Sequence, residues 1–157
     1  MEKYKEKYKE QAPYLETIRA DKQAVSGEDD IKKILRAETL EELSSNGYVG
    51  VIAADGDSVG SILPKLKSLA EYVHFSRKLH DLSTGCVYES LATVLRAGRK
   101  EQPDGEEKRC FHPFELVALG GDDLFLILPA KSTLAMVQEI TRRWEEGRAG
   151  IIPPRQE

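Results

Sequence analysis

The sequence predicts a single α+β domain in which a strand, two helices, a β-hairpin and a last helix follow one another. Residues 48–54 (YVGVIAA) form a short apolar run between Asn-Gly and a cluster of Asp and Gly, which is typical of a buried strand. Residues 58–96 have a mainly helical pattern. Residues 114–119 (FELVAL) and 124–128 (LFLIL) are strand-like runs, and the GGDD between them predicts a hairpin with positive φ values at its glycines.

Composition indicates one soluble domain with a core. The chain has 157 residues, of which 40% are hydrophobic and 32% charged. A formal net charge of −4 argues against a surface that binds nucleic acid throughout, and leaves room for a local basic patch or a basic partner. The start, MEKYKEKYKE, lacks the apolar core of a signal peptide, and no run reaches the roughly 18 apolar residues of a membrane span. We therefore expect a cytoplasmic protein with no membrane partner.

Residues 1–46 predict a helical extension or linker that precedes the domain at 47–152. This segment is rich in Lys and Glu, and its charged runs are typical of solvated helix faces. Its apolar residues recur at spacings of three to five: Ile31, Ile34, Leu35, Leu40 and Leu43.

Pro64, a polar loop and two apolar helix faces define the helical parts of the expected order. Pro64 predicts a break between a short helix and one or two longer ones. Residues 98–108 (GRKEQPDGEEK) predict an exposed loop, because they are polar and have no apolar periodicity. The residues expected on buried helix faces are Val73, Leu79, Val87, Leu91 and Leu95 before the loop, and Leu134, Val137, Ile140 and Trp144 after Pro129.

The first motif that indicates chemistry is Ala54-Asp55-Gly56-Asp57-Ser58-Val59-Gly60, where the first strand ends and a helix begins. Carboxylates at such a strand end can hold a hard divalent cation, and the backbone N–H groups that follow point toward a phosphate chain. The glycines would let that backbone approach a ligand closely. A plain strand-to-helix turn, with Asp57 or Ser58 as the N-cap, is the alternative.

The second motif is Gly120-Gly121-Asp122-Asp123 between two apolar strands. Adjacent acids at a hairpin tip repel each other, a cost that a purely structural turn avoids with Asn-Gly. A bound Mg²⁺ or Mn²⁺ removes this repulsion. A central strand beside a hairpin brings acids from both to one point, as two-metal phosphoryl transfer requires. Asp55, Asp122 and Asp123 are the expected metal ligands, with Asp57 as a fourth candidate.

The motifs ADGDSVG and GGDDLF, with the helical segment FSRKLHDLS between them, resemble the palm domain of the large polymerase/cyclase subunit of type III CRISPR effector complexes. They also resemble the related stand-alone minimal CRISPR polymerase. The resemblance covers about residues 48–146. A more distant similarity is to diguanylate cyclases, whose hairpin reads GGDEF or GGEEF.

The resemblance implies a ferredoxin-like palm, similar to GGDEF cyclases, that condenses ATP into cyclic oligoadenylate with two Mg²⁺ or Mn²⁺ ions. It implies that Asp122 and Asp123 are the catalytic acids of the hairpin and that Asp55 is a further metal ligand. It implies nucleotide binding by the backbone of Gly56, Ser58, Val59 and Gly60, by the hairpin glycines Gly120 and Gly121, and by Ser76 near the base. It also implies CRISPR effector subunits with guide RNA as partners.

The end of the chain departs from this pattern. A complete palm adds a strand and a helix, whereas only GRAGIIPPRQE follows residue 146, and Pro153-Pro154 would end a strand at once. The chain is either a fragment of a longer protein or a shortened palm. Because joining two nucleotides needs a donor and an acceptor, a chain with one GGDD hairpin also predicts a second palm as partner, in a homodimer or from another chain. A structural palm without synthesis and a diguanylate cyclase using GTP remain the alternative functions.

Overall fold

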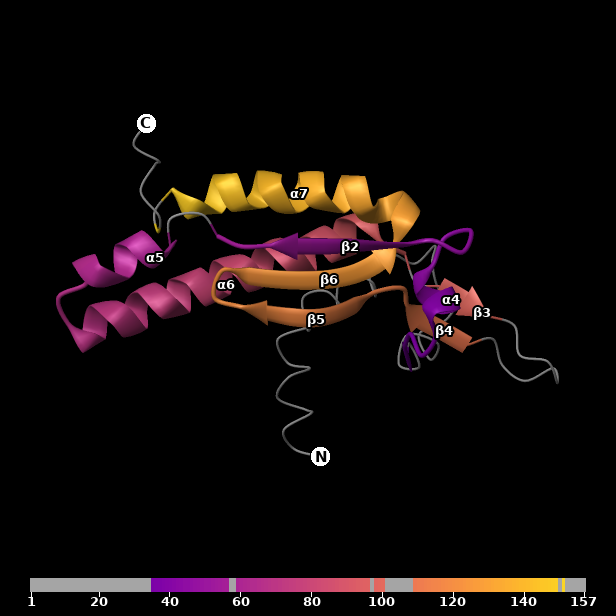
Figure 1. The fold of residues 1–157 in the computed structure, drawn as a ribbon, viewed down its shortest axis with the longest axis horizontal. Coiled ribbons are helices and arrows are strands. Elements are labelled where there is room, and N and C mark those ends of the chain that lie inside the picture. The colour runs from indigo at the N-terminus through magenta and orange to yellow at the C-terminus, as the bar shows by residue number, and fades with distance from the viewer. Residues whose placement is uncertain (1–34, 57–58, 97, 101–108, 150, 152–157) are drawn as a thin grey trace, which may run out of the picture.

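The main sheet has three antiparallel strands in the spatial order β2-β6-β5 (Figure 1). The computed structural model describes residues 35–56, 59–96, 98–100, 109–149 and 151. Within them β2 spans Val49–Ala54, β5 spans Glu115–Gly120 and β6 spans Asp123–Pro129. β6 lies in the centre and pairs with β2 on one side and with β5 on the other. The predicted first strand and hairpin are confirmed, and so is the α+β class.

Two long helices pack on one face of this sheet. α6 spans Leu69–Val94, and α7 spans Ala130–Arg148 and follows β6 directly. Alternate residues of β6 point toward the helices and are buried, as the period of two in a strand requires. The core consists of Ile52 of β2, Leu124, Leu126 and Leu128 of β6, Val87, Tyr88 and Leu91 of α6, Met136 of α7, and Leu95 and Phe114.

The opposite face of the sheet carries exposed side chains, which corrects the expectation of a buried first strand. Only Ile52 of β2 is buried, whereas Val51 is 53% exposed and Val117 of β5 is 56% exposed. A two-layer arrangement buries one side of each strand, so an apolar run alone does not distinguish a half-buried strand from a buried one. Tyr48, which was expected in the strand, instead lies before it in an Asn-Gly turn closed by a bridge to Ser45.

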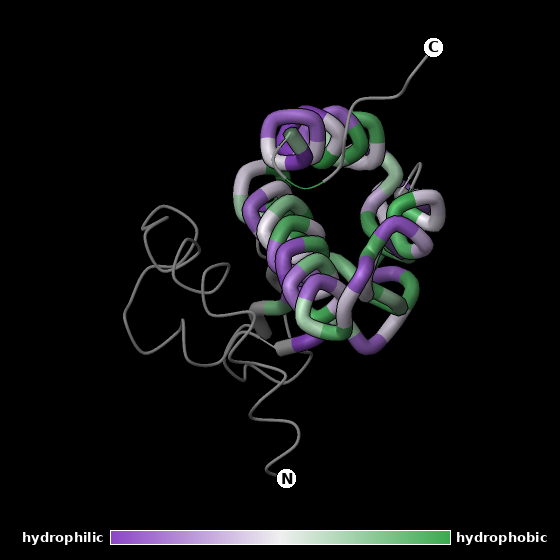
Figure 2. Tube along the Cα trace, turned by 90° about the vertical axis from the view of Figure 1, so that its left-hand side faces the viewer, coloured by the Kyte–Doolittle hydropathy of each residue, from purple (hydrophilic) through white to green (hydrophobic). Residues whose placement is uncertain are grey.

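The helix faces differ from the expected ones at three positions. Val73, Leu134 and Val137 are exposed, whereas Met136 is fully buried. α7 is hydrophobic on one side and hydrophilic on the other (Figure 2), and the side that meets the sheet carries Met136 and the half-buried Ile140. Among the described residues, no helix is long and apolar enough to cross a membrane.

A short helical connection joins β2 to α6. α5 spans Val59–Ile62, and the 3₁₀ helix η1, Leu63–Lys65, contains Pro64 at the predicted break. The side chain of Ser68 accepts a hydrogen bond from the Glu71 N–H at the start of α6, which is an ordinary N-cap. α5 is held by a second core cluster of Val59, Ile62, Phe75 and Leu79, against which Leu66, Trp144 and Ile151 pack.

A second, small sheet lies beside the hairpin strands and was not predicted. It consists of β1 (Leu35–Arg36), β4 (Arg109–His112) and β3 (Gly98–Lys100), with β1 parallel to β4. Two expectations are therefore wrong: residues 35–36 are a strand instead of helix, and residues 98–100 are a strand instead of loop. A helix does occur before residue 46 in the described part, namely α4 (Leu40–Leu43), whereas residues 1–34 lie outside it.

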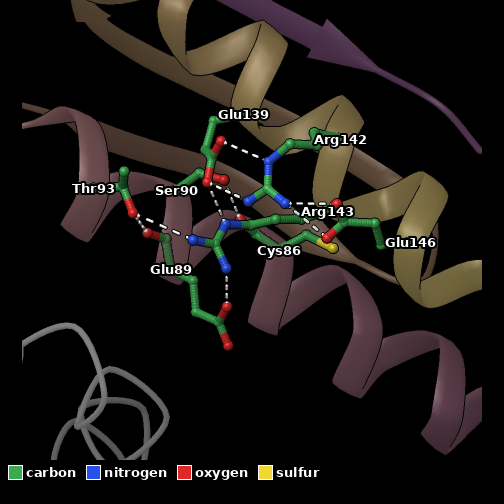
Figure 3. Close-up of polar contacts among 8 residues, drawn as sticks. All are labelled: Cys86, Glu89, Ser90, Thr93, Glu139, Arg142, Arg143 and Glu146. Atoms are coloured by element: carbon green, nitrogen blue, oxygen red, sulfur yellow. Dashed lines mark hydrogen bonds and ion pairs between the residues drawn. The ribbon is translucent and has the colours of Figure 1, made fainter.

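Ion pairs connect the outer surfaces of α6 and α7 (Figure 3). The Arg143 guanidinium reaches across to the Glu89 carboxylate of α6 and bonds to the Glu139 carboxylate of its own helix at 2.9 Å. Arg142 pairs within α7, with Glu139 and Glu146, both at 2.7 Å. The hydrogen bond from Arg142 lowers the pKa of Glu139 most, and the positive charges of Arg142 and Arg143 lower it further, to about 2. Because Arg142, Glu146 and Glu89 are exposed to solvent, these ion pairs contribute little to stability.

We expect His112 of β4 to make the folded protein sensitive to mild acid. Its ring lies 5.8 Å from the Phe114 ring, and burial lowers its pKa from 6.5 to about 4. The unfolded chain then binds the proton more readily, so stability is lost as pH falls from about 6.5 toward 4. Urea unfolding at pH 7 and pH 5 should differ by on the order of 1–2 kcal/mol. The difference should shrink in His112→Gln, and an unchanged pH dependence would show that another group titrates.

Candidate active site

The GGDD sequence forms a two-residue hairpin turn between β5 and β6. Gly120 pairs with Asp123, so Gly121 and Asp122 are the central residues of the turn. Gly121 has a φ of 60°, whereas Asp122 has a negative φ, the combination found in type II′ turns, which favour glycine at the first position. Of the two positive φ values expected from the glycines, only that of Gly121 is therefore present.

The strand register brings Asp55 to the same end of the sheet. The last pair between β2 and β6 is Ala54 with Leu124, so Asp55, the next residue, lies beside Asp123 at the start of β6. Figure 1 shows β2 ending at the same end of the sheet as the β5–β6 turn. Acids that lie 67 positions apart in the sequence, Asp55 and Asp122, thus meet through antiparallel pairing.

Electrostatics indicate how close these acids are. Partial burial raises the pKa of Asp122 above its usual value of 3.8, and the charges of Asp55 and Asp123 and a hydrogen bond with the Asp55 carboxyl raise it further. A backbone hydrogen bond acts in the opposite direction. Like charges at one point cost free energy unless a cation or a proton compensates them. Asp55, Asp122 and Asp123 are therefore one electrostatic unit.

Gly56 permits the contact between β2 and the hairpin. A Cβ atom at this position would lie 2.5 Å from the Asp122 Cβ and 3.4 Å from the Asp122 Oδ2. Cβ atoms do not approach other carbon atoms this closely, so a larger residue would displace either Asp122 or the chain after β2. The sequence suggested that Gly56 lets a ligand come close to the backbone. In the structure, Gly56 also lets Asp122 come close to the backbone.

The acids have suitable chemistry for a divalent cation but do not form a finished cage. Carboxylate oxygens are the donors that Mg²⁺ and Mn²⁺ prefer, and a cation would relieve the repulsion that raises the pKa of Asp122. Within the described ranges, however, no three His, Cys, Asp or Glu side chains are grouped closely enough to hold a metal ion. Asp57, the fourth candidate, lies outside these ranges. The chemistry of Asp55, Asp122 and Asp123 therefore suits a divalent cation, but the cation would need at least one further ligand.

The other residues expected to bind nucleotide differ in their exposure, and one of them lies outside the described part of the chain. Ser58 lies outside the described residues, and the Val59 N–H donates a long hydrogen bond of 3.4 Å to the Gly56 carbonyl. The Val59 side chain is buried in the cluster below α5, whereas Gly60 is exposed. Ser76 is exposed on α6.

The helix serine that contacts the hairpin is Ser83, which the sequence analysis did not select. Its hydroxyl bonds to the Gly121 carbonyl and lies 2.8 Å from the Leu79 carbonyl. Ser76 lies seven positions earlier, about two helical turns away on the same side of α6. One signal could have indicated Ser83, namely a polar residue at a spacing that belongs to the buried face of the helix.

One family model matches most of this fold. It is described as Cas10/Cmr2, second palm domain, and it matches residues 48–150. The matched segment contains all three strands of the main sheet, α6 and α7, and each of the acids above. No curated protein is significantly similar to the chain.

Proposed function

Because the chain belongs to the Cas10/Cmr2 second palm family, we propose that it is a nucleotidyltransferase that condenses ATP into cyclic oligoadenylate-type second messengers. The family places the chain among the palm domains of type III CRISPR large subunits. The observation that carries the proposal is the meeting of Asp55 with Asp122 and Asp123 at one end of the sheet, reflected in the raised pKa of Asp122.

In this proposal Asp55, Asp122 and Asp123 hold Mg²⁺ or Mn²⁺, with Asp57 as a further ligand and two ions in the complete site. Bound cations would neutralise charge on the triphosphate and lower the pKa of the attacking hydroxyl. The protein contributes fixed positions for the acids. β2 and the hairpin are hydrogen-bonded neighbours, so their carboxylates need little reorganisation when nucleotide arrives.

The loop between β2 and α5 is the proposed triphosphate side of the site. Gly56 and Gly60 lack side chains that would keep a phosphate chain from the backbone, and Gly60 is exposed. The exposed Ser76 is on the side of α6 that also carries Ser83, and we assign it to the base. Gly120 and Gly121 leave the hairpin tip open to the sugar and phosphate of a bound nucleotide.

Incubation of the 157-residue chain with each nucleoside triphosphate and Mn²⁺, followed by mass analysis, tests this function. We expect oligoadenylate products from ATP, and no product with EDTA in place of Mn²⁺. Products from GTP alone would favour the diguanylate cyclase alternative. The absence of any product from a chain that binds Mn²⁺ and ATP would favour a palm that serves only a structural role, for which the unfinished acid cage is the supporting observation.

We further propose that synthesis needs a second palm, because one nucleotide presents its hydroxyl while another presents its α-phosphate. Of the elements described, one hairpin of this kind is available per chain. Two chains, or a chain and a palm from another effector subunit, would supply both positions. Specific activity should rise with protein concentration and fall when inactive chains are mixed in. Activity per chain that stays constant on dilution below the dimer dissociation constant would contradict this requirement.

A further inference from the structure

Ser83 stands out on α6 because it is a buried hydroxyl that contacts another element. It is 5% exposed, and its Oγ lies within hydrogen-bonding reach of two carbonyl oxygens, those of Leu79 and Gly121. A serine hydroxyl has one proton, so it donates to one carbonyl at a time or shares its proton between them. The contact with Leu79, one turn back, is the ordinary local bond of a helix serine.

Two other hydroxyls on the same helix make the same local bond. The Ser90 hydroxyl donates to the Cys86 carbonyl at 2.6 Å, and the Thr93 hydroxyl donates to the Glu89 carbonyl at 2.8 Å. Neither hydroxyl bonds to the hairpin; that of Thr93 instead accepts a hydrogen bond of 3.3 Å from the Arg143 guanidinium of α7. Ser90 is also fully buried. The bond to the Gly121 carbonyl therefore distinguishes the Ser83 hydroxyl from the other two.

The orientation of the Gly121 carbonyl affects the position of the Asp122 side chain. This carbonyl belongs to the same peptide group as the Asp122 N–H, so its orientation sets the direction in which the Asp122 side chain leaves the turn. Gly120 and Gly121 have no side chains, and the space where their Cβ atoms would lie is open to 4 Å. Packing therefore does not fix this peptide, and glycine has the largest backbone entropy to lose.

We propose that Ser83 is a positioning residue that holds the hairpin turn, and with it Asp122, in the orientation that binds the cation. This inference rests on the proposed function for its consequence in metal binding, and on the hydrogen bond from α6 to the turn for its structural part. In this role Ser83 acts through the turn, by its bond to the Gly121 carbonyl. It connects the rigid helix layer to the two glycines that precede the acids.

The test compares Ser83→Ala with Ser90→Ala in the 157-residue chain. Both remove a buried hydroxyl from α6 and its bond to the preceding turn, so both should lower the melting temperature to a similar degree. Only Ser83→Ala should speed amide hydrogen exchange at Asp122 and Asp123, by about two- to tenfold, the range expected for the loss of one hydrogen bond. The Mn²⁺ dissociation constant should rise by a similar factor in Ser83→Ala and stay at the wild-type value in Ser90→Ala.

Equal exchange at the turn in the two variants would overturn the inference, whatever the protein's activity. If wild-type protein binds no Mn²⁺, the proposed function fails, and the exchange comparison still decides whether Ser83 holds the turn. Should Ser83→Ala fail to fold, Ser83→Cys keeps a similar volume with a weaker donor. Faster exchange at the turn is expected in that variant too, and exchange at the wild-type rate would overturn the inference.

Discussion

Replacing Asp122 and Asp123 together by alanine should abolish nucleotide polymerisation and leave the protein folded. Asp122 lies in a half-buried turn and Asp123 is exposed at the start of β6, and neither belongs to the core, so their removal opens no core cavity. Their loss removes two of the three carboxylates that meet at this end of the sheet. For a reaction whose catalysis is mainly positioning and electrostatic stabilisation, we expect a fall of at least about 10³-fold.

The stability of this double variant is an independent part of the prediction. The pKa of Asp122 is raised by burial and by neighbouring negative charge, so the folded state binds its proton more readily than the unfolded chain. Ionised Asp122 then opposes folding above the usual pKa of Asp, and the metal-free variant should melt at the same temperature as wild type or slightly higher near pH 7. Asp81→Ala, exposed on α6, controls for lost negative charge. Full product yield from a folded double variant would end the assignment of these acids.

Gly56→Ala should impair the site without removing any acid. The new Cβ would lie 2.5 Å from the Asp122 Cβ, so one of the two must move. Overpacking of this kind costs about 1–3 kcal/mol, and a shift of about 1 Å in a catalytic group can cost about 10²-fold in rate. We expect activity and Mn²⁺ affinity to fall together, while the main sheet stays intact by circular dichroism.

Gly85→Ala is the matched control for Gly56→Ala. Gly85 is on α6, and a Cβ at this position would meet nothing within 4 Å. Alanine in a helix interior is favoured over glycine by about 1 kcal/mol, so the control should be equally active and slightly more stable. If Gly56→Ala is as active as Gly85→Ala, the close approach to Asp122 has no role in the site.

The elements that local chemistry determines were predictable from the sequence. The glycines and the flanking apolar runs indicated the β5–β6 hairpin, and Pro64 indicated the break before α6. The small sheet was not predictable in the same way. β1 has two residues and pairs with β4 across more than 70 positions, and such short strands have no periodicity of their own.

The part of the site that lies at the ends of strands was predictable from the sequence. Asp55 and the hairpin acids were expected to meet because each follows or precedes an apolar strand, and the register confirms that β2 and β6 place them at one end. Ser83 and the tight fit at Gly56 depend on how α6 and the strand end pack against the turn. The spacing on α6 could indicate Ser83 as a buried position, but packing between distant elements leaves no local pattern that would identify the Gly121 carbonyl as its partner.

The shift in melting temperature with Mn²⁺ tests most directly whether β2 and the hairpin form one site. A cation held by both elements binds only the folded chain and stabilises it by an amount that grows with its concentration. We predict that Mn²⁺ raises the melting temperature of wild type, and that Asp55→Asn and Asp122→Asn each lose most of this shift. Asp81→Asn, at an exposed position of α6, should keep it. An Asp55→Asn variant that retains the whole shift would contradict a shared metal site.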